Sequence, residues 1–212
     1  MIYYANPSTE AIRDEMSAGR LGCIITPIQH NTVFTDDGWD VIADNGCFSS
    51  KWTFESWRKW LVRISRSVRF VVCPDVYDPL GNPCHDATLE RWESMSGIIK
   101  RHGFTPAFVC QIGASIENIP EDAEVLFLGG TTEWKLGPEA WNIAMNRGNR
   151  WVHMGRVNSK LRLDTARAMG CDSVDGTHLT FGPDKYLPDV KKWIAASHNE
   201  PMLWENNKNE SN

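Results

Sequence analysis

Val125-Leu126-Phe127-Leu128-Gly129-Gly130 is a short apolar run that ends in two glycines. Other segments share this form, an apolar run closed by a polar or glycine-bearing tip: Val-Ile-Ala-Asp44-Asn45-Gly46, Val-Val-Cys-Pro-Asp75, Phe-Val-Cys-Gln111-Ile-Gly113, Val-His-Met154-Gly155-Arg156 and Ser-Val-Asp175-Gly176. Apolar runs of this length, separated by helix-length segments, are typical of buried parallel strands. Because the carboxyl ends of parallel strands converge on one face, the tips predict an acid-rich pocket there.

The alternation of strands and helices indicates the fold class. Strands are predicted at 2–5, 21–26, 40–43, 70–73, 107–111, 125–128, 151–154 and 173–175, and helices at 9–18, 53–65, 87–102, 138–147, 159–169 and 184–197. The connection 112–124 is short for a full helix, so we expect a single turn there. This pattern predicts a compact (β/α)8 TIM barrel over residues 1–197 as one domain, with a polar, flexible tail at 198–212. A doubly wound open sheet is the alternative, disfavoured because no Gly-x-Gly-x-x-Gly turn opens a helix.

Composition limits the function classes. The chain has 212 residues and a formal net charge of −5, so nucleic acid could be bound only through a local basic patch. Its six cysteines form no Cys-x-x-Cys pair and no zinc-type spacing, which predicts a reduced, cytoplasmic protein without a metal site. The start of the chain lacks the pattern of a signal peptide, and no apolar run approaches the ~20 residues that span a bilayer.

The predicted tips supply candidate site residues. Asp44, Asp75 and Asp175 are candidate acids, and Phe48 offers a ring for stacking. Gln111 could bind the edge of a heterocycle, the Gly129-Gly130 backbone could donate to an oxygen, and Met154 with Gly155 could lie against a ring. A turn or a core position is the alternative for each of them taken singly. Basic residues in or after the same loops predict a clamp for a nucleic-acid backbone: Lys51, Lys135, Arg156, Lys160, Arg162 and His178.

The order of these tips resembles the tRNA-guanine transglycosylases, and more closely their DNA-acting phage relatives of the DpdA type. The segments that carry the resemblance are Asp44-Asn45-Gly46-Cys47-Phe48, Gln111-Ile112-Gly113, Gly129-Gly130, His153-Met154-Gly155 and Asp172-Ser173-Val174-Asp175. The zinc site of the tRNA enzymes is missing from the sequence, and Cys47 replaces a glycine. The resemblance therefore favours the shortened, DNA-modifying branch.

The resemblance implies a pentosyltransferase that exchanges guanine in DNA for a 7-deazaguanine such as preQ0. Asp175 would attack the sugar to form a covalent intermediate, and Asp44 would be the general acid and base. Phe48 and Met154 would enclose the base, while Asp75, Gln111, Gly129 and Gly130 would contact its edge. The implied partners are DNA, with its guanine flipped out or single-stranded, and the free base, in the cytoplasm of a phage host. No cofactor is implied.

The residues leave other functions open. The same exchange could act on tRNA, or a metal-free nucleoside or glycoside hydrolase could use the aspartates. A non-catalytic barrel that binds nucleic acid is the alternative from a different class. The oligomeric state stays open.

Overall fold

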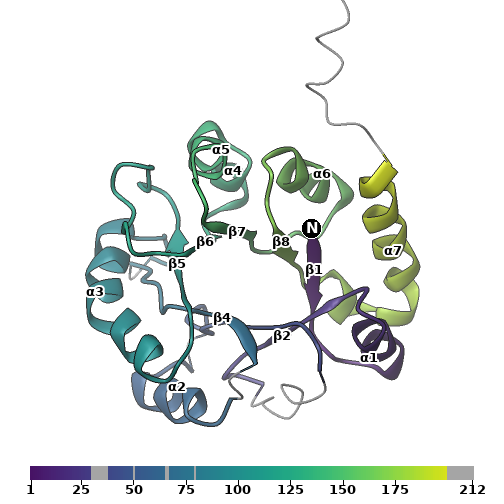
Figure 1. Cartoon of the computed structure of the whole chain (residues 1–212), viewed down its shortest axis with the longest axis horizontal. Coiled ribbons are helices and arrows are strands. Elements are labelled where there is room, and N and C mark those ends of the chain that lie inside the picture. The colour runs from purple at the N-terminus through teal and green to yellow at the C-terminus, as the bar shows by residue number, and fades with distance from the viewer. Residues whose placement is uncertain (30–37, 50, 65–66, 79, 200–212) are drawn as a thin grey trace, which may run out of the picture.

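The computed structural model describes residues 1–29, 38–49, 51–64, 67–78 and 80–199. Its strands are all parallel and close into a barrel in sequence order from β1 to β8. The strands are β1 (Ile2–Ala5), β2 (Gly22–Ile25), β3 (Val41–Ala43), β4 (Val68–Val72), β5 (Pro106–Cys110), β6 (Val125–Leu128), β7 (Trp151–Met154) and β8 (Ser173–Asp175). The view down the barrel in Figure 1 shows them as an inner ring inside a ring of helices. The predicted (β/α)8 barrel is confirmed.

Helices alternate with most of the strands. They are α1 (Glu10–Ser17), α2 (Phe54–Leu61), α3 (His85–Arg101), α4 (Thr132–Lys135), α5 (Pro138–Met145), α6 (Lys160–Ala168), the short 3-10 helix η2 (His178–Phe181) and α7 (Pro183–Asn199). The described connection 111–124 between β5 and β6 forms turns rather than a helix, in line with its predicted shortness. Within the described ranges, no helix is both long enough and apolar enough to cross a membrane.

Most predicted elements differ from the observed ones only at their ends. Helix α2 stops at Leu61, earlier than predicted, and the predicted end at Ser65 lies outside the described residues. Strand β4 starts at Val68 rather than at residue 70, because Val68 pairs with Val41 of β3. Most of the predicted tail, residues 200–212, also lies outside the description.

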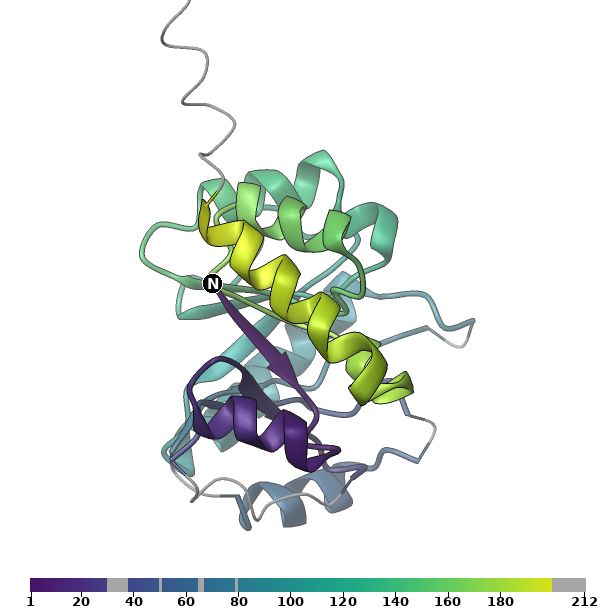
Figure 2. The ribbon, with the colours of Figure 1, turned by 90° about the vertical axis from the view of Figure 1, so that its right-hand side faces the viewer.

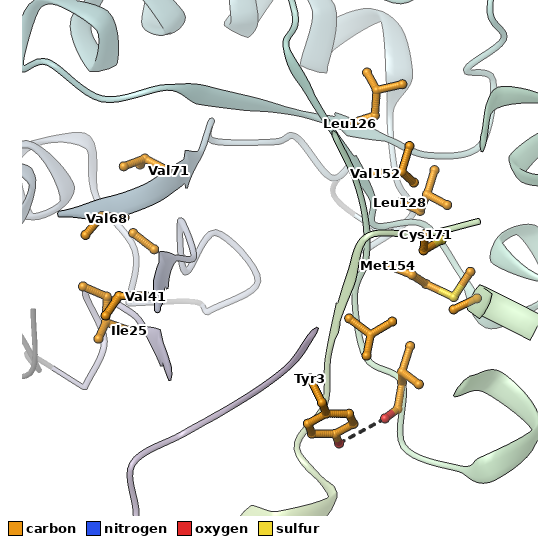
Figure 3. Packing of buried hydrophobic residues seen from close by; sticks show 14 of the residues in the cluster. Tyr3, Ile25, Val41, Val68, Val71, Leu126, Leu128, Val152, Met154 and Cys171 are labelled. Carbon is orange, nitrogen blue, oxygen red and sulfur yellow. Dashed lines mark hydrogen bonds between the residues drawn. The ribbon is translucent and has the colours of Figure 1, made fainter. Parts of the chain in front are cut away.

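Two apolar layers hold the barrel together. The inner layer fills the barrel with Tyr4, Ile24, Ile42, Phe70, Val72, Ala107, Val109 and Val125. The outer layer lies between the strands and the helices, and Figure 3 shows part of it, including Leu126, Leu128, Val152 and Met154. Complete burial of each large apolar side chain contributes roughly 1.5–3 kcal/mol. Because side chains alternate along a strand, a strand can contribute to both layers, as β1 does with Tyr3 and Tyr4, whereas β8 contributes only Val174, to the outer one.

The barrel closes between its first and last strands. Tyr3 and Tyr4 of β1 pair with Val174 and Asp175 of β8. The Tyr3 hydroxyl donates to the Val157 carbonyl at 3.2 Å, a bond drawn in Figure 3. Outside this seam α7 packs between α1 and α6, as the side view in Figure 2 shows. The pairing of β1 with β8 therefore fixes the position of Asp175 relative to the other strands of the barrel.

Candidate functional site

A pocket of about 90 Å³ opens where the strands end at their carboxyl sides. Apolar side chains from the inner layer, those of Ile24, Val72, Val109 and Phe127, form its floor. Its walls are polar and come from the strand tips, namely Asp44, Asn45, Phe48, Asp75, Tyr77, Gly129, Gly155, Arg156 and Asp175. Three carboxyl groups therefore face one small space, although β3, β4 and β8 are far apart in sequence.

Asp44 directly follows β3, and its backbone N–H donates to the Ile25 carbonyl at 2.9 Å. The residue is partly buried. Desolvation, and then the negative charges of Asp175 and Asp75, raise the pKa of Asp44 to about 7. A carboxyl with such a pKa can both give and accept a proton near neutral pH.

Asp75 lies deeper in the pocket and is held by Asn45. The Asn45 amide donates to Asp75 Oδ1 at 2.9 Å and to the Cys73 carbonyl at 3.0 Å. The Asn45 Oδ1 accepts from the Cys47 backbone at 2.7 Å, so the turn after Asp44 is fixed by the same side chain. Burial raises the pKa of Asp75, and the hydrogen bond from Asn45 works against this rise.

Asp175 is the last residue of β8, and two groups lie within hydrogen-bond distance of its carboxyl. His153 Nε2 lies 2.9 Å from its Oδ2, and the Arg156 backbone N–H donates to its Oδ1 at 3.3 Å. The Asp175 backbone carbonyl accepts from the Val157 N–H. The carboxyl is thus oriented by the neighbouring strand β7 and by the loop that follows it.

Gly155 keeps the pocket open beside Asp175. A Cβ atom at this position would lie 2.8 Å from the Phe127 ring and 3.3 Å from Asp175 Oδ2. Gly129 is equally confined, since its Cβ would lie 2.6 Å from a Val109 methyl group. Any larger residue at either position would take space from the pocket or from the floor beneath it.

Arg156 forms the rim in a strained backbone conformation. Its φ of 58° is the only positive value at a non-glycine residue of the described chain. Lys135 Nζ donates to the Gly155 carbonyl on one side, and Arg162 Nη1 donates to the Arg156 carbonyl at 3.1 Å on the other. The Arg156 guanidinium lies 4.0 Å from the centre of the Phe48 ring, which itself contacts Tyr77 edge-on. Strain held in this way is typical of ligand sites.

The structure places only some of the predicted base-binding residues in the pocket. Asp44, Phe48, Asp75, Gly129, Gly155 and Asp175 line it. Gln111, Gly130 and Met154 do not. Gln111 is buried and donates to Thr88 Oγ1 at 2.8 Å, and Met154 points outward into the layer under the helices. The structure therefore does not bring these two side chains together with the carboxyls of the pocket.

The residues of the predicted backbone clamp differ in their exposure. Lys135 is only 2% exposed, and its ammonium is used by the Gly155 carbonyl. Burial lowers the pKa of Lys135 to about 8, although the charge of Asp175 counteracts this. Lys135 therefore cannot contact a phosphate from outside. His178 packs against Tyr186 and Trp193, whereas Lys51, Lys160 and Arg156 stay exposed.

Several residues of the site escaped prediction. Asn45 and Tyr77 line the pocket, and His153 supports Asp175 from below. The sequence feature that could have indicated them is a polar residue within or next to an apolar run, such as His153 in Val-His-Met. Arg156 was predicted as a clamp residue, but it belongs to the pocket wall.

Two other features bear on what the site can hold. Among the described residues, no group of three or more His, Cys, Asp or Glu side chains is arranged to bind a metal ion. A wider hollow of about 900 Å³ lies at the opposite end of the barrel, and most of its cations are paired with carboxylates: Arg69 with Asp40, Lys100 with Asp122 and Arg147 with Asp172. The small pocket, by contrast, brings three carboxyl groups together without a salt bridge to Lys or Arg among the described residues.

Comparison with known proteins identifies the fold and no family. No protein-family model matches the chain, and no curated protein matches it. Among solved structures it resembles 3-hexulose-6-phosphate synthase from Salmonella typhimurium, with a TM-score of 0.56 and 11% identity over 93% of this chain and 99% of that one.

Two further similar structures are tryptophan synthase α-subunits. The first is a mutant from Pyrococcus furiosus, with a TM-score of 0.55 and 10% identity over 92% of this chain and 93% of that one. The second is from Legionella pneumophila, with a TM-score of 0.52 and 13% identity over 93% of this chain and 88% of that one. At such identities the likeness shows the barrel fold alone.

These findings overturn the resemblance to the tRNA-guanine transglycosylases. The similar structures belong to other barrel families, and no family model supports the short motifs on which the resemblance rested. The functions drawn from it, guanine exchange in DNA and a phage origin, are corrected with it. Binding of DNA or of a free base stays an untested prediction, and the oligomeric state stays open.

Proposed function

We propose that this chain is an enzyme of the lyase or synthase type, which uses Asp44 as a general acid and Asp175 as a general base. The observation that carries the proposal is one pocket in which Asp44, with a pKa of about 7, faces two other carboxyls. In many enzymes, two neighbouring carboxyls act as acid and base because their environments give them different pKa values. The similar solved structures are synthases on the same fold, which agrees with this class without adding weight to it.

The proposed reaction transfers one proton from the enzyme to the substrate and one from the substrate to the enzyme. Protonated Asp44 gives its proton to the substrate atom whose bond breaks, while ionised Asp175 takes a proton from an atom of the part that stays. The two transfers leave the summed charge of the carboxyls unchanged, and water at the open mouth restores the starting state. General acid–base catalysis of this kind contributes typically ~10²–10⁴-fold to a rate.

The walls favour a planar ligand that is rich in N–H groups. Asp75 and Asp175 can accept hydrogen bonds inside the pocket, and Phe48 offers a ring face at the rim. The Arg156 guanidinium, itself a planar N–H-rich cation, already lies on that face. The pocket is smaller than the ~150 Å³ cavity that encloses benzene. It therefore takes one end of a ligand, and we propose an amidine, a guanidine or an amino-substituted heterocycle.

A binding screen tests the ligand class. Benzamidine, guanidinium and aminopyrimidines are titrated into the protein with NMR detection, with ribose 5-phosphate as an anionic comparison. We expect only the N–H-rich compounds to shift resonances of the pocket. Asp75→Asn should weaken their binding about tenfold or more, whereas Asp14→Asn, on the exposed face of α1, should not change it. Preferential binding of the sugar phosphate would contradict the proposed ligand class.

Exchange of hydrogen for deuterium tests the chemistry. Ligands of the same class that carry a C–H bond next to the N–H-rich group, such as acetamidine and 2-amino-4-methylpyrimidine, are incubated with the enzyme in D₂O, because a general base that removes a carbon-bound proton introduces deuterium at that carbon. We expect exchange with wild type and with Asp14→Asn, and a loss of at least 100-fold with Asp44→Asn or Asp175→Asn. Binding without exchange for every ligand would mean that the barrel is a binding protein and not an enzyme.

A further inference from the structure

A line of hydrogen-bonded side chains runs through the barrel beneath the pocket. Trp151 Nε1 donates to Ser173 Oγ at 2.8 Å, and Ser173 Oγ lies 2.8 Å from His153 Nδ1. His153 Nε2 in turn lies 2.9 Å from Asp175 Oδ2. His153 and Ser173 are both fully buried, and they are register partners on β7 and β8.

The order of donors and acceptors in this line follows from its first member. An indole N–H only donates, so Ser173 Oγ must accept from Trp151. Ser173 has one hydroxyl hydrogen, and among the described residues its remaining partner is His153 Nδ1. If Nδ1 accepts that hydrogen, Nε2 carries the ring proton and donates it to Asp175. In this arrangement every polar atom of the line has a partner.

The other protonation states leave a group unsatisfied. With the proton on Nδ1, the bare Nε2 would face Asp175 Oδ2, and an ionised carboxylate would repel it. With both ring nitrogens protonated, the Ser173 hydroxyl would lose its acceptor. An unsatisfied buried polar group costs ~1–3 kcal/mol. Neutral His153 with an Nε2–H is therefore the state that matches an ionised Asp175.

The surroundings of His153 hold its ring in place. Phe127 stacks on the ring with the two centres 4.7 Å apart, and Phe70 contacts it edge-on at 5.6 Å. Tyr4, the remaining polar neighbour, turns its hydroxyl to Asp40 at 2.9 Å and leaves the ring nitrogens free for Ser173 and Asp175. A buried ring wedged in this way cannot rotate to offer Asp175 a different atom.

We propose that His153, fixed by Ser173 and Trp151 as the Nε2–H tautomer, is a positioning residue that holds the Asp175 carboxyl in place as the base of the pocket. The role of Asp175 as a base rests on the proposed function, whereas the hydrogen-bonded line and the tautomer of His153 do not depend on it. The hydrogen-bonded line thereby gives the two carboxyls different roles. The negative charge of Asp175 raises the pKa of Asp44, which favours the protonated form of Asp44. The groups facing Asp175 are His153, Tyr3, Lys135, Arg156 and Asp44.

Nitrogen NMR of the full chain tests the tautomer without any variant. Long-range ¹⁵N–¹H correlation spectra distinguish a protonated from a bare ring nitrogen, and the spectrum of His153→Gln assigns the signals. We expect Nδ1 in the range of a bare nitrogen and Nε2 in the range of a protonated one at pH 7. A protonated Nδ1, in either the other tautomer or the imidazolium, would overturn the inference.

Carbon NMR of the aspartate carboxyls tests the consequence. His153→Phe keeps a ring for Phe127 to stack on but removes the donor, whereas His153→Gln can restore a donor through its amide. We expect the Asp175 carboxyl carbon signal to shift in His153→Phe, which removes the hydrogen bond to Oδ2, and to stay near its wild-type position in His153→Gln. The Asp44 titration should change in His153→Phe and not in His153→Gln, because the Asp175 charge that raises the pKa of Asp44 is no longer held in place.

The two variants also separate a positioning role from a structural one. A residue that merely fills space would leave both carboxyl signals unchanged in His153→Phe, and that result would overturn the inference. None of these readouts needs a substrate. If Asp44→Asn retained deuterium exchange while the NMR results held, the proposed function would fail and the inference about Asp175 would survive.

Discussion

Replacement of Asp44 by asparagine should stabilise the protein, and more so as the pH rises. In the folded state the pKa of Asp44 lies at about 7, well above its ordinary value of 3.8. Between these values the folded protein holds a proton that the unfolded chain has released. Stability therefore falls with rising pH through this range and stays low above pH 7. Asparagine has no charge to bury, so it escapes this loss.

The size of the effect follows from the difference between the two pKa values. At ~1.36 kcal/mol per pH unit, a rise from 3.8 to about 7 corresponds to about 4 kcal/mol in the free energy of unfolding. The asparagine oxygen can replace the carboxylate as acceptor, so few hydrogen bonds are lost. We expect Asp44→Asn to be close to wild type at pH 4 and more stable by about 2–4 kcal/mol at pH 8.

Urea unfolding followed by circular dichroism at pH 4, 5, 6, 7 and 8 measures this difference. The exposed variant Asp14→Asn is the matched control, because it removes the same group from a solvated helix face and should show no pH-dependent gain. A difference between Asp44→Asn and wild type that is constant with pH would refute the reasoning. So would a variant less stable than wild type at pH 8, since Asp44 would then be ionised and well paired.

Other changes test the rim and the floor of the pocket. Arg156→Gly should be more stable than Arg156→Ala by about 1 kcal/mol in thermal or urea unfolding, because only glycine adopts the observed φ of 58° without strain; equal stabilities would mean that the strain is absent. Both variants should raise the pKa of Asp44 in a carboxyl titration, since the positive charge of Arg156 lowers it; an unchanged midpoint would show that the guanidinium does not face that carboxyl. Gly155→Ala should lose ~1–3 kcal/mol of stability and weaken binding of an N–H-rich ligand, because the added methyl group would press on the Phe127 ring and narrow the pocket beside Asp175. Gly148→Ala, which meets no atom within 4 Å, should leave that binding unchanged.

The sequence was a good guide to the fold because each strand is an apolar run between polar tips. The same feature located the carboxyls of Asp44, Asp75 and Asp175, since a polar residue that closes a parallel strand belongs to the mouth of a barrel. It could not show which way a side chain turns. Met154 and Gln111 stand at strand ends like the carboxyls, yet the first points outward and the second ties down Thr88.

Short motifs were a poor guide to the family. Asp44-Asn45-Gly46 and Gly129-Gly130 recur at strand ends for reasons of backbone geometry. Gly46 adopts a φ of 70° against Pro27, and Gly129 has no room for a side chain against Val109. Such requirements are common to barrels with different functions. Lys135 fails for a related reason: its place after a strand suggested a surface cation, but the α4 turn buries it beneath the Gly155 carbonyl.

The arrangement of the carboxyls follows from the two-residue period of β8. Ser173 and Asp175 both point into the barrel, and register with β7 brings His153 between them. An ionised carboxylate at the end of β8 then acts across the pocket on Asp44, whose own burial already disfavours charge. The proposed acid and the proposed base therefore depend on the same contacts of β7 and β8, and any change that neutralises Asp175 should alter both. The partly buried carboxyl of Asp44 costs stability that the two apolar layers must offset, which is the usual relation between a functional site and its scaffold.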